Sequence, residues 1–197
     1  MGYQGVKFRT EVIGREVPQS PRIKELKYWC RKFSSQGFAP VYEGGSYGNL
    51  SFRLQESKDQ FIITASGIDL GEELSDDCFV KVEDCDLKKG VVYASGEREP
   101  SSESILHFVI YHERKDVNVI FHGHSKNILE QANELGIPQT SKEEPCGPNE
   151  LVRRVFYDKA FLIMKNHGFI SLGRTMREAG EWLKPYSVDG GRGFLTG

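Results

Sequence analysis

Two histidines, His122 and His124, stand one residue apart at the end of an apolar run. Residues two apart on a β-strand point to the same side, so both imidazoles would face one spot. His167 offers a third imidazole at the end of a second apolar run. Three histidines that leave a coordination position open are typical of catalytic zinc, whereas structural zinc sites are usually closed and rich in cysteine. We therefore predict a metal site at these three residues; half-exposed strand histidines without a metal are the simpler alternative.

A carboxylate and two hydroxyl groups follow Pro100, in the order Ser101, Ser102 and Glu103. The pattern predicts the first turn of a helix, where free backbone N–H groups and the helix dipole attract anions. The two serines could hold a phosphate or a carboxylate there, or they could simply cap the helix. The turns Gly48-Asn49 and Ser66-Gly67 are further places where the backbone can approach an anion closely, and are ordinary turns otherwise.

Hydrophobic spacing predicts the elements that must position these residues. We expect helices over residues 21–35, 101–115, 127–135, 151–156 and 176–184, and strands over residues 6–12, 50–54, 61–64, 79–82, 91–93, 117–124, 160–164 and 169–172. Helices before, between and after the strands, without a regular strand–helix repeat, predict an α/β layered domain with a mainly antiparallel sheet.

Several element ends carry their own signals. Ser20 is expected to cap the first helix with Pro21 in its first turn, and Thr175-x-x-Glu178 is a capping box for the last helix, which Pro185 should end. The acidic residues 83–86, together with Gly90, are expected to form the turn between two strands. His107 and His112 are five residues apart on one predicted helix, so we expect them to point in different directions and to be structural or exposed.

The composition favours a folded protein that acts on small molecules. The chain has 197 residues, 38% of them apolar, and its 26 Lys and Arg nearly balance its 28 Asp and Glu, so no strong field favours nucleic acid or an anionic membrane. No apolar run approaches the length of a membrane span or a secretory signal. We expect a cytoplasmic location and one domain over residues 1–197, with an accessory N-terminal strand within residues 1–19 and a flexible tail over residues 186–197. The four cysteines are expected to be free, buried thiols, namely Cys30, Cys78, Cys85 and Cys146.

Five motifs follow one another along the chain. They are Gly48-Asn49-Leu50-Ser51-Phe52-Arg53, Ile63-Thr64-Ala65-Ser66-Gly67, Pro100-Ser101-Ser102-Glu103, His122-Gly123-His124-Ser125, and Asn166-His167-Gly168 with Gly173-Arg174-Thr175. No single motif is specific, but their order is, and taken together they resemble the class II aldolase/adducin family over roughly residues 20–183.

The resemblance implies a three-layer α/β/α sandwich around a mainly antiparallel sheet, often assembled as a cyclic homotetramer with active sites between subunits. It implies Zn²⁺, or another divalent transition metal, on the three histidines, and Glu103 as the acid/base residue. It further implies that the substrate phosphate binds five residues, namely Asn49, Ser66, Gly67, Ser101 and Ser102. The expected activity is that of a zinc-dependent, aldolase-like lyase that cleaves a phosphorylated sugar or sugar acid through a metal-stabilised enediolate.

Among the departures from the aldolases of this family, which include a shorter interval between His124 and His167, one bears on the reaction. The aldolases carry a tyrosine in the stretch after the His-x-His pair, and this chain has none between Leu129 and Val155. Epimerase, dehydratase and decarboxylase reactions of the same family therefore stay open, because all of them can pass through the same stabilised anion. A non-catalytic, adducin-like binding domain and a structural metal site without turnover are the alternatives from other classes.

Overall fold

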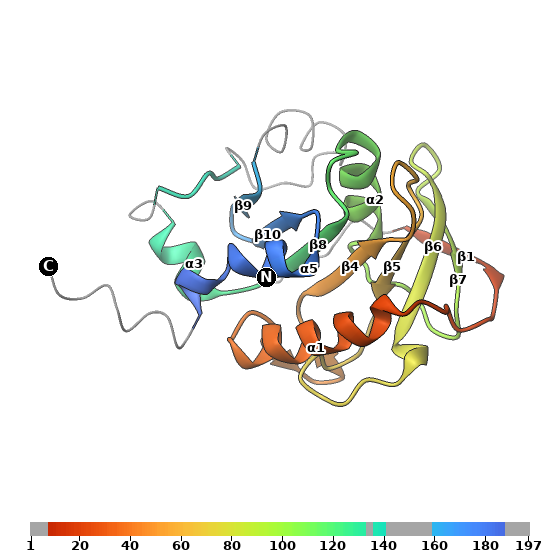
Figure 1. Cartoon of the computed structure of the whole chain (residues 1–197), viewed down its shortest axis with the longest axis horizontal. Coiled ribbons are helices and arrows are strands. Elements are labelled where there is room, and N and C mark those ends of the chain that lie inside the picture. Colours follow the sequence, from red (N-terminus) through yellow and green to blue (C-terminus); the bar gives the residue numbers. More distant parts are fainter. Residues whose placement is uncertain (1–7, 133–135, 141–158, 188–197) are drawn as a thin grey trace, which may run out of the picture.

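A mixed sheet of eight strands runs through the part of the chain that the computed structural model describes, which is residues 8–132, 136–140 and 159–187 (Figure 1). Every neighbouring pair is antiparallel except β1 and β7, so the predicted mainly antiparallel sheet is confirmed. In spatial order the strands are β1 (Arg9–Gly14), β7 (Val91–Ser95), β6 (Phe79–Asp86), β5 (Phe61–Thr64), β4 (Asn49–Arg53), β8 (Val119–Gly123), β10 (Gly168–Gly173) and β9 (Phe161–Met164).

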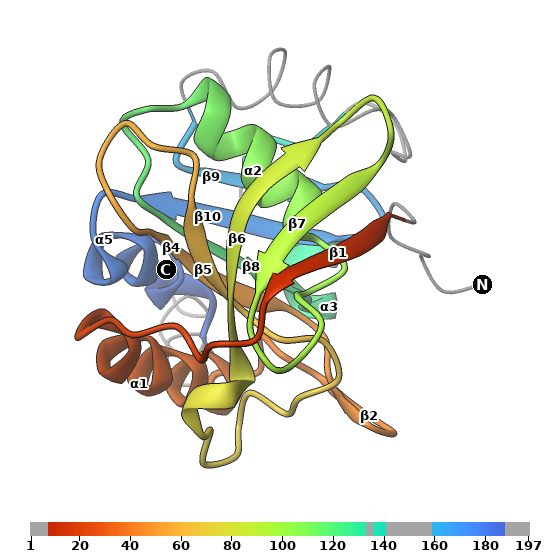
Figure 2. The ribbon, with the colours of Figure 1, turned by 90° about the vertical axis from the view of Figure 1, so that its right-hand side faces the viewer.

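Helices cover both faces of this sheet. On one face α1 (Arg22–Ser35) lies beside α5 (Met176–Glu181) (Figure 2). The ring of Trp29 on α1 packs against that of Phe121 on β8, with centroids 5.6 Å apart. On the other face lies α2 (Ser104–Glu113), whose His107 Nδ1 is 2.7 Å from the hydroxyl of Ser51 on β4. The resulting helix–sheet–helix layering confirms the three-layer α/β/α prediction. A further short helix among the described residues is α3 (Lys126–Gln131), which follows β8.

Side chains along β4 point alternately to the two faces of the sheet, and this alternation shows which face carries the candidate site. Arg22 of the α1 layer lies over the ring of Phe52, 4.5 Å from its centroid, whereas Ser51 points to α2. Asn49 is two residues before Ser51 and therefore shares the α2 face. Because Asn49 pairs with His122 across β4 and β8, both side chains lie on this face.

A small hairpin leads into β4. Its strands are β2 (Val41–Tyr42) and β3 (Gly45–Ser46), which pair with each other and not with the main sheet. The backbone N–H of Ser46 donates to the carbonyl of Ile68 (2.9 Å), and the hydroxyl of Ser46 accepts from the N–H of Leu70 (3.0 Å). These bonds attach the hairpin to the loop after β5.

The predicted turn at residues 83–86 is wrong, because these residues continue β6. Asp84 pairs with Tyr93 and Cys85 with Val92, and Cys85 is buried. The chain turns only after Asp86, whose carboxylate accepts the backbone N–H groups of Lys88 and Lys89. Acidic side chains are tolerated in this strand because none of them is buried: Asp84 is exposed, Glu83 and Asp86 are partly exposed, and a register shift between Val82 and Asp84 interrupts the alternation.

Some helix ends also differ from prediction. The hydroxyl of Ser20 accepts the backbone N–H of Arg22 (3.3 Å) as predicted for a cap, although Pro21 is the residue directly before α1. The second helix, α2, begins at Ser104, after the Pro100–Glu103 motif instead of within it. Thr175 caps α5 as predicted, accepting from the N–H of Glu178 (3.1 Å). That helix ends at Glu181, before Pro185 is reached, and Pro185 lies in a separate 3-10 helix over Lys184–Tyr186.

Other predictions are tested only within the described residues. Cys30, Cys78 and Cys85 are free and buried, as expected; Cys146 lies outside the described residues. So do the helix predicted over residues 151–156, part of that over 127–135, and the predicted tail beyond residue 187. None of the described helices combines the length and the apolar character needed to cross a bilayer. Tyr186, assigned to the tail, stacks on Phe161 with centroids 5.2 Å apart.

Candidate metal centre

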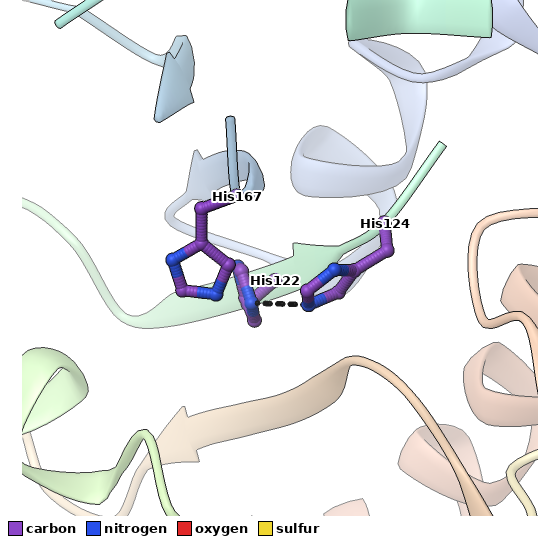
Figure 3. Close-up of side chains that lie close together, drawn as sticks. All are labelled: His122, His124 and His167. Atoms are coloured by element: carbon purple, nitrogen blue, oxygen red, sulfur yellow. Dashed lines mark hydrogen bonds between the residues drawn. The ribbon is translucent and has the colours of Figure 1, made fainter. Parts of the chain in front are cut away.

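The side chains of His122, His124 and His167 converge on one point, as the sequence predicts (Figure 3). Each offers a ring nitrogen, and these nitrogens lie within 4.8 Å of one another. The ring centroids are 4.9 to 5.1 Å apart. His122 lies at the end of β8 and His124 just beyond it, so the two share a face because they are two residues apart.

The glycine between the two strand histidines is required by packing on the opposite face. A Cβ atom at Gly123 would lie 2.5 Å from ring atoms of both Phe33 and Phe169, and 2.9 Å from the carbonyl oxygen of Phe38. These aromatic rings form the core beneath the site. With no side chain at Gly123, β8 can lie tightly on this core while presenting both imidazoles to the other face.

His167 reaches the site from the turn between β9 and β10. Asn166 adopts a left-handed conformation (φ 58°), and the N–H of His167 donates to the carbonyl of Met164 (3.0 Å), which closes the turn. The turn lies next to His122 because β10 pairs with β8, Ile170 standing opposite His122. This strand order is a long-range feature, and it brings the third histidine to the other two.

Hydrogen bonding and burial prepare the histidines for a metal. Nδ1 of His122 lies 3.0 Å from the carbonyl oxygen of Phe169 and donates to it, which leaves Nε2 unprotonated. Burial, reinforced by the neighbouring imidazoles, lowers the pKa of His122 well below its ordinary value. Burial likewise lowers the pKa of His124 to about 4 and that of His167 to about 3. At neutral pH all three rings are uncharged, the form in which histidine binds a metal.

The donor set suits a tetrahedral transition metal with one open position. Nε2 of His122 is 3.1 Å from Nε2 of His124. Two nitrogens bound to one zinc ion at about 2.0–2.1 Å stand about 3.3 Å apart in a tetrahedron, so little movement is needed. Three imidazoles without a thiolate are typical of catalytic zinc. The residues present therefore fit the metal that the sequence predicts.

The carboxylate of Glu103 completes the group. Glu103 is the N-cap of α2, and its Oε1 lies 3.7 Å from Nε2 of His167. The residue is only 8% exposed, and burial raises its pKa to about 7. A bound metal cation would lower that value again, because it favours the carboxylate form. The carboxyl group is thus placed where it can exchange a proton with a molecule bound at the metal position.

A cleft of about 420 Å³ opens in front of these groups. All five residues predicted to bind phosphate line it, namely Asn49, Ser66, Gly67, Ser101 and Ser102. The Oδ1 atom of Asn49 is buried and, among the described residues, has no hydrogen-bond partner, as expected of a group that awaits a ligand. The hydroxyl of Ser101 accepts from the N–H of Glu103 (3.3 Å), which stabilises the turn that leads into α2.

The sequence prediction missed two aromatic residues in the cleft. Tyr42 and Tyr47 both line it, and the ring of Tyr47 lies 5.2 Å from that of His124. In the sequence the two tyrosines lie on either side of Gly44-Gly45. Their polar, glycine-rich surroundings predict only a turn, and they do not reveal that both rings line a cleft. His107 and His112 do not line the cleft, in agreement with prediction: the first is buried against Ser51, and the second pairs with Asp59.

Sequence comparison agrees with this geometry. Residues 24–184 match the family model described as the class II aldolase and adducin N-terminal domain. The chain is 39% identical over 174 residues to a methylthioribulose-1-phosphate dehydratase of Leptospira biflexa, covering 70% of this chain and 81% of that protein. It is 30% identical over 165 residues to an L-fuculose phosphate aldolase of Methanocaldococcus jannaschii, covering 76% of this chain and 83% of that protein.

Solved structures show the same fold. An L-fuculose 1-phosphate aldolase superposes with a TM-score of 0.63 at 24% identity, covering 83% of this chain and 80% of that one. YgbL from Escherichia coli, described as a putative aldolase/epimerase/decarboxylase, superposes with a TM-score of 0.66 at 18% identity, covering 88% of each chain. With the family model matched over most of its length, the chain belongs to the class II aldolase and adducin family.

Proposed function

We propose that this protein is a zinc-dependent lyase that acts on a small phosphorylated ketose, with the metal held by His122, His124 and His167. The observation that carries the proposal is the position of Glu103, whose carboxylate lies 3.7 Å from His167 in the cleft that the three histidines line. A structural zinc site usually has four protein ligands, and it leaves no open position beside which a buried carboxylate could act. A non-catalytic, adducin-like domain would have no need of either group.

The residues of the cleft have separate roles in the proposed reaction. When bound, zinc supplies a Lewis acid that stabilises negative charge on the adjacent carbonyl and hydroxyl oxygens of a ketose. Glu103 takes a proton from the substrate or returns one to a leaving oxygen. The hydroxyls of Ser101 and Ser102, the turn at Ser66-Gly67 and the amide of Asn49 bind the phosphate.

Among the reactions open to this site, we infer that dehydration is the first candidate. Glu103 removes the proton from the carbon next to the carbonyl, the hydroxyl group on the following carbon leaves as water, and the resulting enol becomes a second carbonyl. Two observations support this choice. The chain shares 39% identity with the dehydratase from Leptospira biflexa, and it has no tyrosine between Leu129 and Val155.

Carbon–carbon cleavage is the second candidate, because the chain is 30% identical to L-fuculose phosphate aldolase of Methanocaldococcus jannaschii. In this reaction the hydroxyl proton of the carbon beyond the bond is removed, the carbon–carbon bond breaks, and an aldehyde leaves. The electron pair stays on the carbon next to the carbonyl, and that carbon then takes up a proton to complete the second product. We further propose that the protein works as a homo-oligomer, a tetramer with sites between subunits, which light scattering of the full chain can measure.

Mass spectrometry of the products separates these candidates. Zinc-loaded protein is incubated with methylthioribulose 1-phosphate and, separately, with fuculose 1-phosphate. Dehydration yields a phosphate product lighter by one water, whereas cleavage yields dihydroxyacetone phosphate and an aldehyde. The zinc-free protein and the Glu103→Gln variant are the controls and should yield neither. Epimerisation would change stereochemistry without changing mass. Turnover of neither substrate by zinc-loaded protein would contradict the proposal, as would full activity in the zinc-free protein.

A further inference from the structure

Two tyrosines of the small hairpin and its exit form a surface of their own in the cleft. The rings of Tyr42 and Tyr47 pack together with centroids 4.9 Å apart, and both side chains line the cleft. Tyr42 is 40% exposed and Tyr47 49%. We name this pair the aromatic wall. Exposed large side chains that cluster beside a binding site commonly mark a contact surface for a ligand.

The aromatic wall and Glu103 lie beside different histidines of the proposed metal site. The Tyr47 ring is 5.2 Å from the ring of His124, whereas the Glu103 carboxylate approaches His167. A substrate bound to the metal would thus meet a carboxylate beside one histidine and an aromatic face beside another. The wall and the acid/base residue therefore lie beside different histidines of the same proposed metal position.

The backbone holds Tyr47 firmly in this place. Its N–H donates to the carbonyl of Pro40 (2.9 Å), and the preceding Ser46 is bonded to the loop after β5. Gly48, directly after it, adopts a left-handed conformation (φ +88°), and a Cβ there would lie 2.8 Å from the carbonyl oxygen of His122. This close approach to β8 ties the position of Tyr47 to that of the metal ligands.

The rest of the cleft offers little apolar surface. Among the described residues that line it, Ala65 is the one aliphatic side chain, and the others are serine, asparagine, glycine, histidine, glutamate and the two tyrosines. Hydroxyls and amides suit the phosphate, but they gain nothing from an apolar group. An aromatic face, by contrast, binds hydrocarbon and thioether groups well.

We propose that Tyr47, supported by Tyr42, is a specificity-determining residue that packs against the substrate end remote from the phosphate and selects substrates in which that end is apolar, such as a thioether. This inference deepens the proposed function and rests on it for the phosphorylated nature of the substrate. The aromatic face is what matters, so phenylalanine should serve nearly as well as tyrosine at this position.

The test compares two ketose 1-phosphates that share one carbon skeleton and differ at the last carbon, which bears a methylthio group in one and a hydroxyl in the other. In Tyr47→Ala, kcat/KM for the thioether should fall by about tenfold or more, mainly through KM, and by far less for the hydroxyl compound. Tyr47→Phe should stay close to the parent. Tyr28→Ala is the matched control, because Tyr28 is 51% exposed and packs on Trp29 but does not line the cleft.

Equal losses of kcat/KM for the two substrates in Tyr47→Ala would overturn the inference. A Tyr47→Phe variant as impaired as Tyr47→Ala would also overturn it, as would a changed oligomeric mass of Tyr47→Ala in light scattering that accounts for its loss of activity. The same comparison is made by calorimetric binding in a zinc-loaded Glu103→Gln background, where no turnover occurs. If the parent protein turns over neither compound, the proposed function fails. The role of the aromatic wall is then tested separately by binding: Tyr47→Ala should weaken binding of the thioether more than binding of the hydroxyl compound, and equal weakening would contradict that role.

Discussion

Gly123 of β8 stands directly opposite Phe169 of β10, and a Cβ atom on Gly123 would lie 2.5 Å from the Cζ atom of that ring. His122 on β8 and His124 just beyond it are therefore separated by a position that admits no side chain. This contact ties the geometry of the site on one face of the sheet to the aromatic core on the other.

Gly123→Ala should destabilise the protein by about 1–3 kcal/mol, because the added methyl group overpacks the core between Phe33 and Phe169. Urea denaturation of the zinc-free protein measures this change. Gly136→Ala is the comparison, since nothing lies within 4 Å of a Cβ there and only its positive φ of 63° opposes the substitution. A Gly123→Ala variant as stable as the parent would show that the contact with Phe169 does not restrict the strand.

Glu103→Gln should lower kcat by about a hundredfold or more, because glutamine cannot exchange a proton with the substrate. Zinc content should stay at the level of the parent, since the three histidines are unchanged. Glu113→Gln, at the other end of α2, should leave kcat unaltered. Steady-state kinetics and metal analysis of both variants check this, and loss of zinc in Glu103→Gln would instead make the carboxylate a required ligand.

Arg53 is 1% exposed, and its guanidinium donates to the carbonyl groups of Val117 (3.0 Å), Tyr111 (2.7 Å) and Arg114 (3.0 Å). Arg53→Leu should cost about 3 kcal/mol or more, because these buried carbonyls lose their donors. Chemical denaturation against the exposed Arg177→Leu, expected to have little effect, measures the difference. Similar stability of the two variants would contradict a structural role for the buried charge.

His107 should make the zinc-free protein sensitive to acid. Burial lowers the pKa of His107 in the folded protein to about 3, from an ordinary 6.5. Between these two pH values the unfolded chain therefore carries a proton on this side chain that the folded protein does not. Stability contributed by this difference is complete above pH 6.5 and falls as the pH drops toward 3, by about 1.4 kcal/mol per pH unit. In His107→Leu, the fall in the free energy of unfolding between pH 6 and 4 should be shallower by about that slope; an unchanged slope would refute the assignment.

The sequence predicts local features of this protein better than distant ones. His122 and His124 could be placed together because two residues on one strand share a face whatever the rest of the fold. The acidic residues 83–86 were assigned to a turn because local composition does not reveal that Tyr93 and Val92 pair with them. The parallel pairing of β1 with β7 is equally invisible to local patterns.

The candidate site follows the same division. His167 could be named from the sequence, but its approach to His122 depends on the pairing of β10 with β8. Tyr47 was missed because its importance lies in its contact with His124, 77 positions along the chain, and not in its own neighbours; the distance between the rings is 5.2 Å.

The central claim is that His122, His124 and His167 hold a catalytic metal, and metal analysis coupled to activity tests it most directly. The purified protein, the chelator-treated protein and the His122→Ala variant are compared for bound zinc and for turnover of a phosphorylated ketose. We predict one zinc ion per chain in the parent, loss of both zinc and turnover on chelation with recovery when zinc is restored, and neither property in a folded His122→Ala variant. Turnover that survives complete removal of metal, or stoichiometric zinc in His122→Ala, would contradict the account.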